Sequence, residues 1–376
     1  MIPVILLLAA VAVAAVEEVT AYPVGEPPAS APTTTPSAEP KKDEDKVAGP
    51  TLSGYLLPTF ALRRRAGALP KDTWAYGVQN TAAGLVLEQA ILPTLGYTLY
   101  AELNVNELSF EEATIYVQPL AMLKLKVGRM LVPFMEESLA ILTRRLFPDR
   151  AAPTSYFLSG TDLGVLAEVK VPGDIATVSG GVFNGNGVTI GEGKDRGRMY
   201  ALRADVAPLG AVPATVDTKG GGPRVAAGTG LVYYPSVVFD DAGFVSAHAS
   251  DVRLDLSLKV AVKGFSFQTE YMRRQRSDSV TDLIDRASGW YAQAAYYHQL
   301  TKVFGIASIA RYGTVGSDQT FVRRTTRWLE AGMSLYTAKG DKPTGGGKLT
   351  LIYSGEFRPT EGDSAHGATL QYLLTF

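Results

Sequence analysis

Basic side chains at alternate positions are the residues of this sequence best suited to chemistry. Lys124 and Lys126 are separated by a single leucine, and Arg144, Arg145 and Arg150 follow in the next long connection. Ammonium and guanidinium groups attract anions, so a row of them along a water-filled passage would influence which ions enter it. The expected chemistry is therefore ion selection, without bonds being made or broken.

Enzymatic chemistry has little support in the sequence. Cysteine is absent, which excludes a thiol nucleophile, a disulfide and a Cys-ligated metal. The three histidines, His248, His298 and His366, are scattered along the chain and offer no metal cluster or Ser-His pair. We expect neither an enzyme nor a cofactor. The net charge of −1, without a compact basic block, gives no reason to expect a nucleic-acid partner.

The elements that position the charges are strands, because apolar residues recur with a period of two. The clearest segment is Asp251–Lys263, where leucines and valines take one face and charged or small polar residues the other. It runs for about 11 residues, the length of a tilted membrane-spanning strand, whereas soluble strands average about 5–6. The same alternation appears in 97–106, 123–127, 200–206, 348–357 and 370–376.

The cost of burying charge in lipid decides which face points where. A Lys or Arg facing the middle of the bilayer costs about 2–4 kcal/mol. The basic residues opposite apolar neighbours must therefore face a wet lumen. They are Lys124, Lys126, Lys170, Arg203, Arg253, Lys259, Lys263, Arg311 and Lys348. Acids at lumen positions are nearly as numerous, namely Glu102, Glu168, Asp205, Asp255, Glu270, Glu330 and Glu356.

The connections between strands alternate in length, as expected of an outer-membrane barrel. Short turns are expected at 171–174, 263–264 and 299–302, and long polar links at 185–197, 235–250, 273–288, 314–326 and 358–367. From Thr51 to Phe376 the pattern fits an all-β, antiparallel transmembrane β-barrel of about 16 strands, enough to leave an aqueous channel. One link, Pro208–Pro223, is too long for its place among the short turns.

The N-terminal 50 residues have a different composition. Residues 1–16 are apolar and too short for a membrane span, so we expect a secretory signal peptide. Residues 17–50 are rich in proline and polar residues, which predicts a disordered periplasmic linker. Residues 51–376 would then form the barrel domain in the bacterial outer membrane.

Several short motifs resemble the phosphate-selective porin O and P family. They are Gly128-Arg-Met-Leu-Val-Pro-Phe-Met-Glu136, Asp162-Leu-Gly164, Gly180-Gly-Val-Phe-Asn-Gly-Asn-Gly187, Gly289-Trp-Tyr-Ala-Gln-Ala-Ala-Tyr296 and Ala310-Arg-Tyr312. The resemblance implies a homotrimeric channel for small solutes or anions such as phosphate. It also implies a third loop that folds into the pore, here Met130–Thr161.

A short helix over Glu136–Phe147 is expected in that loop, with acids in its first turn and arginines in its last. The basic residues expected to set the field at the constriction are Arg144, Arg145, Arg150, Lys124, Lys126 and Arg129. Those expected to line the lumen are Lys170, Arg203, Arg253, Lys259, Lys263, Arg311, Glu102 and Asp255. The rival interpretation is that the loop arginines pair with Glu136, Glu137 and Asp149 to hold the loop.

Two functions from different classes remain open. The first is a porin for passive diffusion of small solutes, and the second is a non-conducting barrel that serves as an anchor or adhesin. Both would contact outer-membrane lipid and lipopolysaccharide. The final strand ends on the aromatic Phe376, a pattern that resembles the signal read by barrel-assembly machinery. This strand must also pair with the one beginning near Thr51, because lipid does not tolerate an unpaired edge.

Overall fold

The computed structural model describes residues 49–65, 74–104, 108–140, 142–185, 195–213, 216, 222–239, 245–278, 284–319, 322–339, 342–359 and 363–376. The segments expected to be a signal peptide and a periplasmic linker lie outside these residues, apart from Gly49 and Pro50. The first strand begins at Thr51, where the sequence predicts the start of the barrel.

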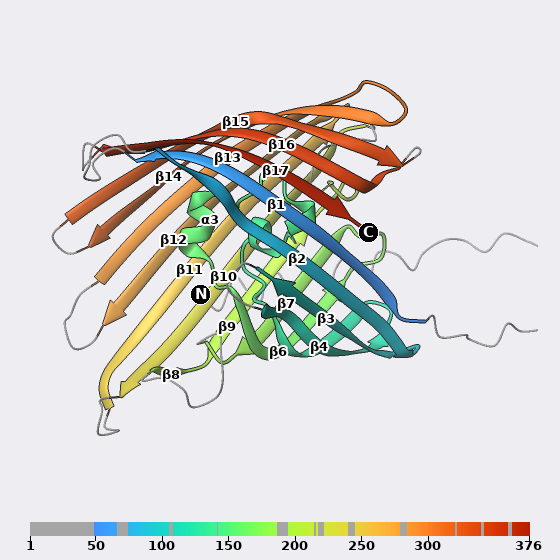
Figure 1. Ribbon diagram of the computed structural model, residues 1–376. Helices are drawn as coiled ribbons and strands as arrows, with labels where there is room; N and C mark the ends of the chain where they lie inside the picture. The colour runs from blue at the N-terminus through green and yellow to red at the C-terminus, as the bar shows by residue number, and fades with distance from the viewer. Residues whose placement is uncertain are drawn as a thin grey trace, which may run out of the picture. The chain divides into compact units, whose positions relative to one another are not determined.

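One antiparallel sheet accounts for nearly all of the described chain (Figure 1). Its first half consists of β1 (Thr51–Arg65), β2 (Trp74–Leu92), β3 (Leu95–Leu103), β4 (Leu108–Leu120), β5 (Leu123–Leu131), β6 (Thr161–Lys170), β7 (Ala176–Phe183), β8 (Asp195–Gly197) and β9 (Met199–Val206). Its second half consists of β10 (Arg224–Phe239), β11 (Val245–Val262), β12 (Phe265–Asp278), β13 (Ile284–Gln299), β14 (Phe304–Gln319), β15 (Val322–Lys339), β16 (Lys342–Arg358) and β17 (Asp363–Thr375).

The sheet closes on itself through its first strand. β1 pairs with β2 on one side and with β17 on the other, so the predicted pairing of the two ends is confirmed. β8 and β9 both pair with β10 and form one interrupted strand, which makes a closed barrel of 16 strands. The expected strand count and fold class are therefore confirmed.

The two faces of the strands carry the chemistry that their alternation predicts. In β11, Leu256 and Leu258 are exposed on the outer face, whereas Asp255 and Ser257 are buried toward the inside. Leu370 and Tyr372 of β17 are likewise exposed, as is Phe376, the residue after it. Because successive side chains of a strand point to opposite faces, every second residue points outward, and these residues form an apolar surface that faces lipid.

Several links expected to be long are occupied mainly by strand. β10 and β11 leave only residues 240–244 between them, and β14 and β15 leave only 320–321. Hairpin hydrogen bonds can continue beyond the membrane, where both faces of a strand are wet and polar residues suit either face. The hydrophobic alternation therefore ends before the strand does. For this reason the links predicted from the sequence are longer than the observed ones.

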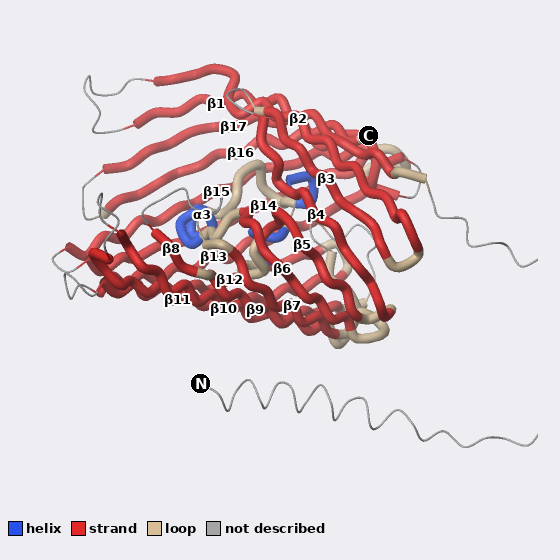
Figure 2. Tube along the Cα trace, turned by 90° about the horizontal axis from the view of Figure 1, so that it is seen from below, coloured by secondary structure: helices blue, strands red, loops and turns tan. Residues whose placement is uncertain are grey.

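The long connection between β5 and β6 contains the helices of the described chain (Figure 2). They are α2 (Glu136–Leu139), the 3-10 turn η2 (Leu142–Arg144) and α3 (Ala152–Phe157). The single helix expected over Glu136–Phe147 is wrong, because the backbone becomes extended at Ala140. Anchoring of this segment to several strands overrides its local helical preference.

Candidate functional site

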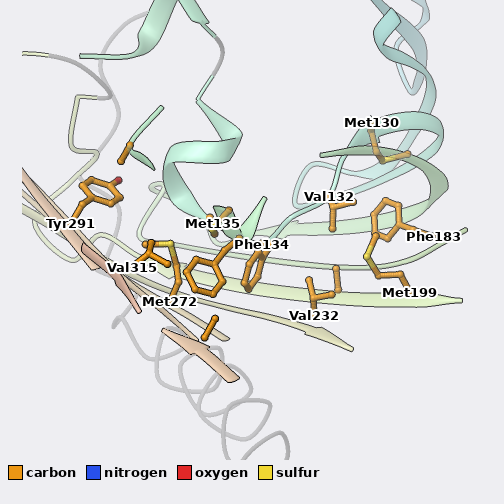
Figure 3. Close-up of a cluster of buried hydrophobic side chains, with 14 of the residues drawn as sticks. Met130, Val132, Phe134, Met135, Phe183, Met199, Val232, Met272, Tyr291 and Val315 are labelled. Atoms are coloured by element: carbon orange, nitrogen blue, oxygen red, sulfur yellow. The ribbon is translucent and has the colours of Figure 1, made fainter. Parts of the chain in front are cut away.

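A hydrophobic cluster attaches the β5–β6 connection to strands of the barrel that are not neighbours of β5 or β6. Phe134 and Met135 are fully buried together with Met272 of β12, Tyr291 of β13 and Val315 of β14 (Figure 3). Burying side chains of this size contributes about 1.5–3 kcal/mol each. Figures 1 and 2 both draw the helices of this connection within the ring of strands.

A glycine permits the closest backbone approach in this contact. A side chain at Gly230 of β10 would overlap the carbonyl oxygen of Phe134. That carbonyl accepts a hydrogen bond from Arg203 Nη1 at 2.7 Å. The connection is thus held at its start both by apolar packing and by a charged donor of the barrel wall.

Glu137 is the first ionic anchor of the connection. Its Oε1 accepts from Arg311 Nη1 of β14 at 3.1 Å, and its Oε2 accepts from Ala151 N at 2.9 Å and Thr154 Oγ1 at 2.6 Å. Its own backbone N–H donates to Glu270 Oε1 at 2.7 Å. One carboxylate therefore joins α2, the start of α3 and the barrel wall in a single buried network.

Glu136 is the second ionic anchor. It accepts from Arg203 Nη2 of β9 at 2.8 Å and pairs with Lys259 of β11. Burial alone would raise the pKa of Glu136, but the charges of Lys259 and Arg203 outweigh burial and lower it. Arg203 also pairs with Asp205 at 2.5 Å and with Asp255 at 3.0 Å.

The other end of the connection is held by wall residues as well. Lys348 of β16 donates to the carbonyl oxygens of Arg145 at 3.0 Å and Leu146 at 2.7 Å. Arg253 of β11 donates to the carbonyl oxygens of Phe157 at 3.2 Å and Leu158 at 3.1 Å, at the end of α3. It also pairs with Asp251 at 2.8 Å.

The arginines of the connection are not used for its anchoring. Within the described chain, Arg144, Arg145 and Arg150 form no ion pair, and Arg144 is exposed at the end of η2. Arg145 donates to the carbonyl oxygen of Ala140 at 3.2 Å. Burial and the neighbouring Arg150 lower the pKa of Arg145 to about 10, so it stays charged at neutral pH. Among the described residues, the rival pairing of these arginines with Glu136, Glu137 and Asp149 is therefore not present.

Lys124 and Lys126 lie on the inner face of β5, as expected. Lys124 lies over the ring of Tyr116 at 3.8 Å, and Lys126 is 3.6 Å from Glu112. Glu102 of β3 also faces inward, where Tyr55 and Tyr100 donate to it. Lys170, at the end of β6, is exposed and 3.5 Å from Glu168.

Two basic residues are not where the sequence placed them. Arg129 pairs in register with Ala113 and Leu163 and shares the outer face of β5 with the exposed Val127. It donates to Thr161 Oγ1 at 2.9 Å. Lys263 is in the turn between β11 and β12, with a φ of 48°, and so does not line the wall. Strict alternation assigned Lys263 to a strand that ends one residue earlier.

The sequence also missed part of the anchoring network. Arg203 and Arg311 were expected to be wet lumen residues, but both are covered by the β5–β6 connection and are almost fully buried. Lys348 was not identified as an anchor, and Glu136 and Glu137 were considered only as partners of the loop arginines, not of the wall. The available signal was that bases and acids at inner positions are nearly equal in number, which favours pairing over a free charged surface.

Among the described residues, no helix has the length and apolar character needed to cross a membrane. In the same part of the chain, no group of three or more His, Asp or Glu side chains is arranged to hold a metal ion.

A closed 16-stranded antiparallel barrel, with a long connection anchored to several of its strands, defines a porin-type β-barrel. The family model "Phosphate-selective porin O and P" matches residues 82–229, which confirms the resemblance seen in the motifs. The stretches Gly128–Glu136 and Gly180–Gly187 fall within the match. No curated protein matches the sequence.

Solved structures support the same fold. An anion-selective porin from Comamonas acidovorans has 10% identity and a TM-score of 0.60, over 87% of this chain and 100% of that one. The outer membrane channel DcaP of Acinetobacter baumannii has 13% identity and a TM-score of 0.56, over 89% and 99%. The trimer form of OmpT from Vibrio cholerae has 11% identity and a TM-score of 0.55, over 87% and 100%. At these identities the likeness concerns the fold.

Proposed function

We propose that this protein is an outer-membrane porin through which small solutes diffuse passively, with a preference for small anions. The observation that carries the proposal is the division of charges around the β5–β6 connection. The acids Glu136 and Glu137 are paired with wall cations, whereas Arg144, Arg145 and Arg150 form no ion pair with the described residues, and Glu137 and Glu102 act on Arg145 only at longer range. A cation that is not paired with a carboxylate, beside a narrow aqueous path, attracts anions and repels cations.

In this proposal the connection 132–160 is the constriction loop, and its three arginines set the local field. Lys124 and Lys126 add positive charge on the facing part of the wall, partly offset by Glu112 and Glu168. Buried pairs such as Arg311 with Glu137 hold the loop and contribute little net field. Nothing in this arrangement is specific for phosphate, so we propose a general preference for small anions, with phosphate as one candidate.

The assembly and location follow from the same class of protein. We propose export by the N-terminal apolar segment, a homotrimeric state, contact of the outer rim with lipopolysaccharide and recognition of the last strand by barrel-assembly machinery. The rim with the short turns, where β1 begins and β17 ends, would face the periplasm. The alternative is a non-conducting anchor or adhesin, and it makes the opposite prediction for conductance.

Planar bilayer recording tests the proposal. The protein should conduct, and a potassium chloride gradient should give a reversal potential that reports preferential chloride flow. The double substitution Arg144→Glu with Arg150→Glu should reverse or abolish that preference. Arg198→Glu, at an exposed arginine between β8 and β9, is the matched control and should leave it unchanged.

Two outcomes would overturn different parts of the proposal. A folded wild-type barrel without conductance would remove the porin function and favour the anchor. An unchanged reversal potential in the double variant would remove the role of the arginines while leaving the channel intact.

A further inference from the structure

The link between β9 and β10, residues 207–223, is the one whose length the sequence left without explanation. It joins strands at the rim where the other connections are short, such as 263–264 and 340–341. The structure describes 207–213, 216 and 222–223 of this link. Residues 207–213 and Val216 carry no charge.

The link begins as a tight turn. Ala207 N donates to Ile175 O at 2.6 Å, and Gly210 N donates to Ala207 O at 3.0 Å. Gly210 has a φ of 89°, which a residue without a side chain adopts readily. Leu209, within this turn, is 55% exposed.

Beyond the turn, the chain packs against the constriction loop. Val212 and Pro213 line a space of only about 10 Å³ together with Leu146 of the loop, Lys259 of β11 and Gln293 of β13. A space of this size barely holds one water molecule, so these surfaces are close-packed.

Val216 completes this contact from within a hydrophobic cluster. It is 2% exposed, and the cluster contains Leu146 and Phe147 of the constriction loop. The remaining members are inward-facing residues of four consecutive strands, namely Ala295, Tyr297, Ala307, Ile309, Tyr336 and Ile352. A link that stayed outside the barrel could not be buried among these side chains.

A larger cavity also borders the link. It has a volume of about 220 Å³ and is lined by Ala211 and Val212 together with Glu136, Asp205 and Lys259. Since a water molecule occupies about 30 Å³ of liquid, the cavity is large enough for several waters. The link therefore borders a polar space that Glu136 also lines.

We infer that the described part of the β9–β10 link, residues 207–213 and Val216, is a second size-restricting element of the pore, docked on the tip of the constriction loop from the opposite rim. The inference rests on the proposed porin function. The loop arginines would select the sign of the solute, while these uncharged residues narrow the lumen along β13–β16. Size and charge selection would then reside in separate segments.

The first experiment releases the link without altering charge. The double substitution Val212→Ser with Val216→Ser should raise single-channel conductance roughly twofold, because more of the barrel cross-section becomes water-filled. In liposome swelling it should admit larger neutral sugars than the wild type, with an unchanged reversal potential. Leu209→Ser, at the exposed turn, is the control and should behave as wild type. Unchanged conductance and exclusion limit in a folded double variant would overturn the inference.

The second experiment tests the placement of the link directly. Because the chain has no cysteine, Leu146→Cys with Val212→Cys introduces a single pair of thiols. A short bis-maleimide should cross-link this pair in the membrane-embedded protein, whereas Leu146→Cys with Leu209→Cys should stay uncross-linked. Absence of cross-linking in the first pair would overturn the placement. This readout needs no conductance, so failure of the porin function and failure of this inference are distinguishable.

Discussion

Arg311 of β14 donates to Glu137 of the β5–β6 connection at 3.1 Å, although 174 residues separate them in the chain. Both side chains are almost fully buried, and Arg311 also pairs with Glu330 at 2.5 Å. A buried charge requires a partner, so this pair couples the loop position to the integrity of the wall. The anchoring of the loop is thus encoded jointly by distant strands.

Glu137→Gln should weaken the docking of the loop. Removing one partner of a buried ion pair costs about 3–5 kcal/mol, and here we expect about 2 kcal/mol because Glu330 still neutralises Arg311. Thermal unfolding in detergent should show a lower midpoint, and single-channel records should show more frequent current fluctuations. Glu356→Gln is the control, since the partly exposed pair of Glu356 with Arg358 contributes at most about 1 kcal/mol. Equal midpoints for both variants would argue against an anchoring role for Glu137.

The pKa of Glu136 predicts how far the pH can fall before this carboxylate stops holding the loop in place. Burial raises this pKa, but the positive charges of Lys259 and Arg203 lower it by more than burial raises it. The net shift is therefore downward from 4.5, even though the carboxylates Asp205 and Asp255 lie nearby. A depressed pKa in the folded state means that the stabilisation is complete above the ordinary glutamate range and is lost as pH falls through the folded value. The contribution of Glu136 to loop docking should therefore persist from neutral pH down to its ordinary value of 4.5, and its loss below that value should make the currents noisy.

The variant Glu136→Gln separates this carboxylate from others that titrate in acid. It should already give noisy currents at neutral pH and should lack the acid transition assigned to Glu136. A variant that keeps the wild-type acid transition would show that other carboxylates cause it.

Much of the barrel could be predicted from the sequence, because each strand carries its own evidence. The apolar residues of Asp251–Lys263 face outward as their period requires, and the pairing of β1 with β17 follows from the absence of free edges in lipid. Alternation is a local signal that survives without knowledge of neighbouring strands. It fails where both faces of a strand are wet, as in the hairpins on either side of 240–244 and 320–321.

The site was less predictable, because its contacts join segments far apart in the chain. Glu136 was expected to stabilise a helix or pair with a loop arginine, but its partners Arg203 and Lys259 come from β9 and β11. Val216 gave no sequence signal, since the two isolated valines of this irregular link show no period. Which acid pairs with which base depends on how the loop crosses the barrel. Local sequence patterns do not predict such long-range contacts.

Phe376 is bonded through its backbone to the first strand of the barrel. Phe376 and Gly54 exchange two backbone hydrogen bonds of 3.0 Å each, so the final residue helps to close the barrel on β1. Its ring is exposed on the outer face, where lipid would surround it.

Deleting Phe376 removes both bonds and leaves an unsatisfied edge, which is costly in lipid. We expect a lower yield of heat-modifiable barrel in outer-membrane fractions, while barrels that do assemble keep wild-type conductance. Phe376→Tyr keeps the backbone bonds and the aromatic ring and should assemble normally. Normal yield from the deletion would show that closure does not depend on this residue.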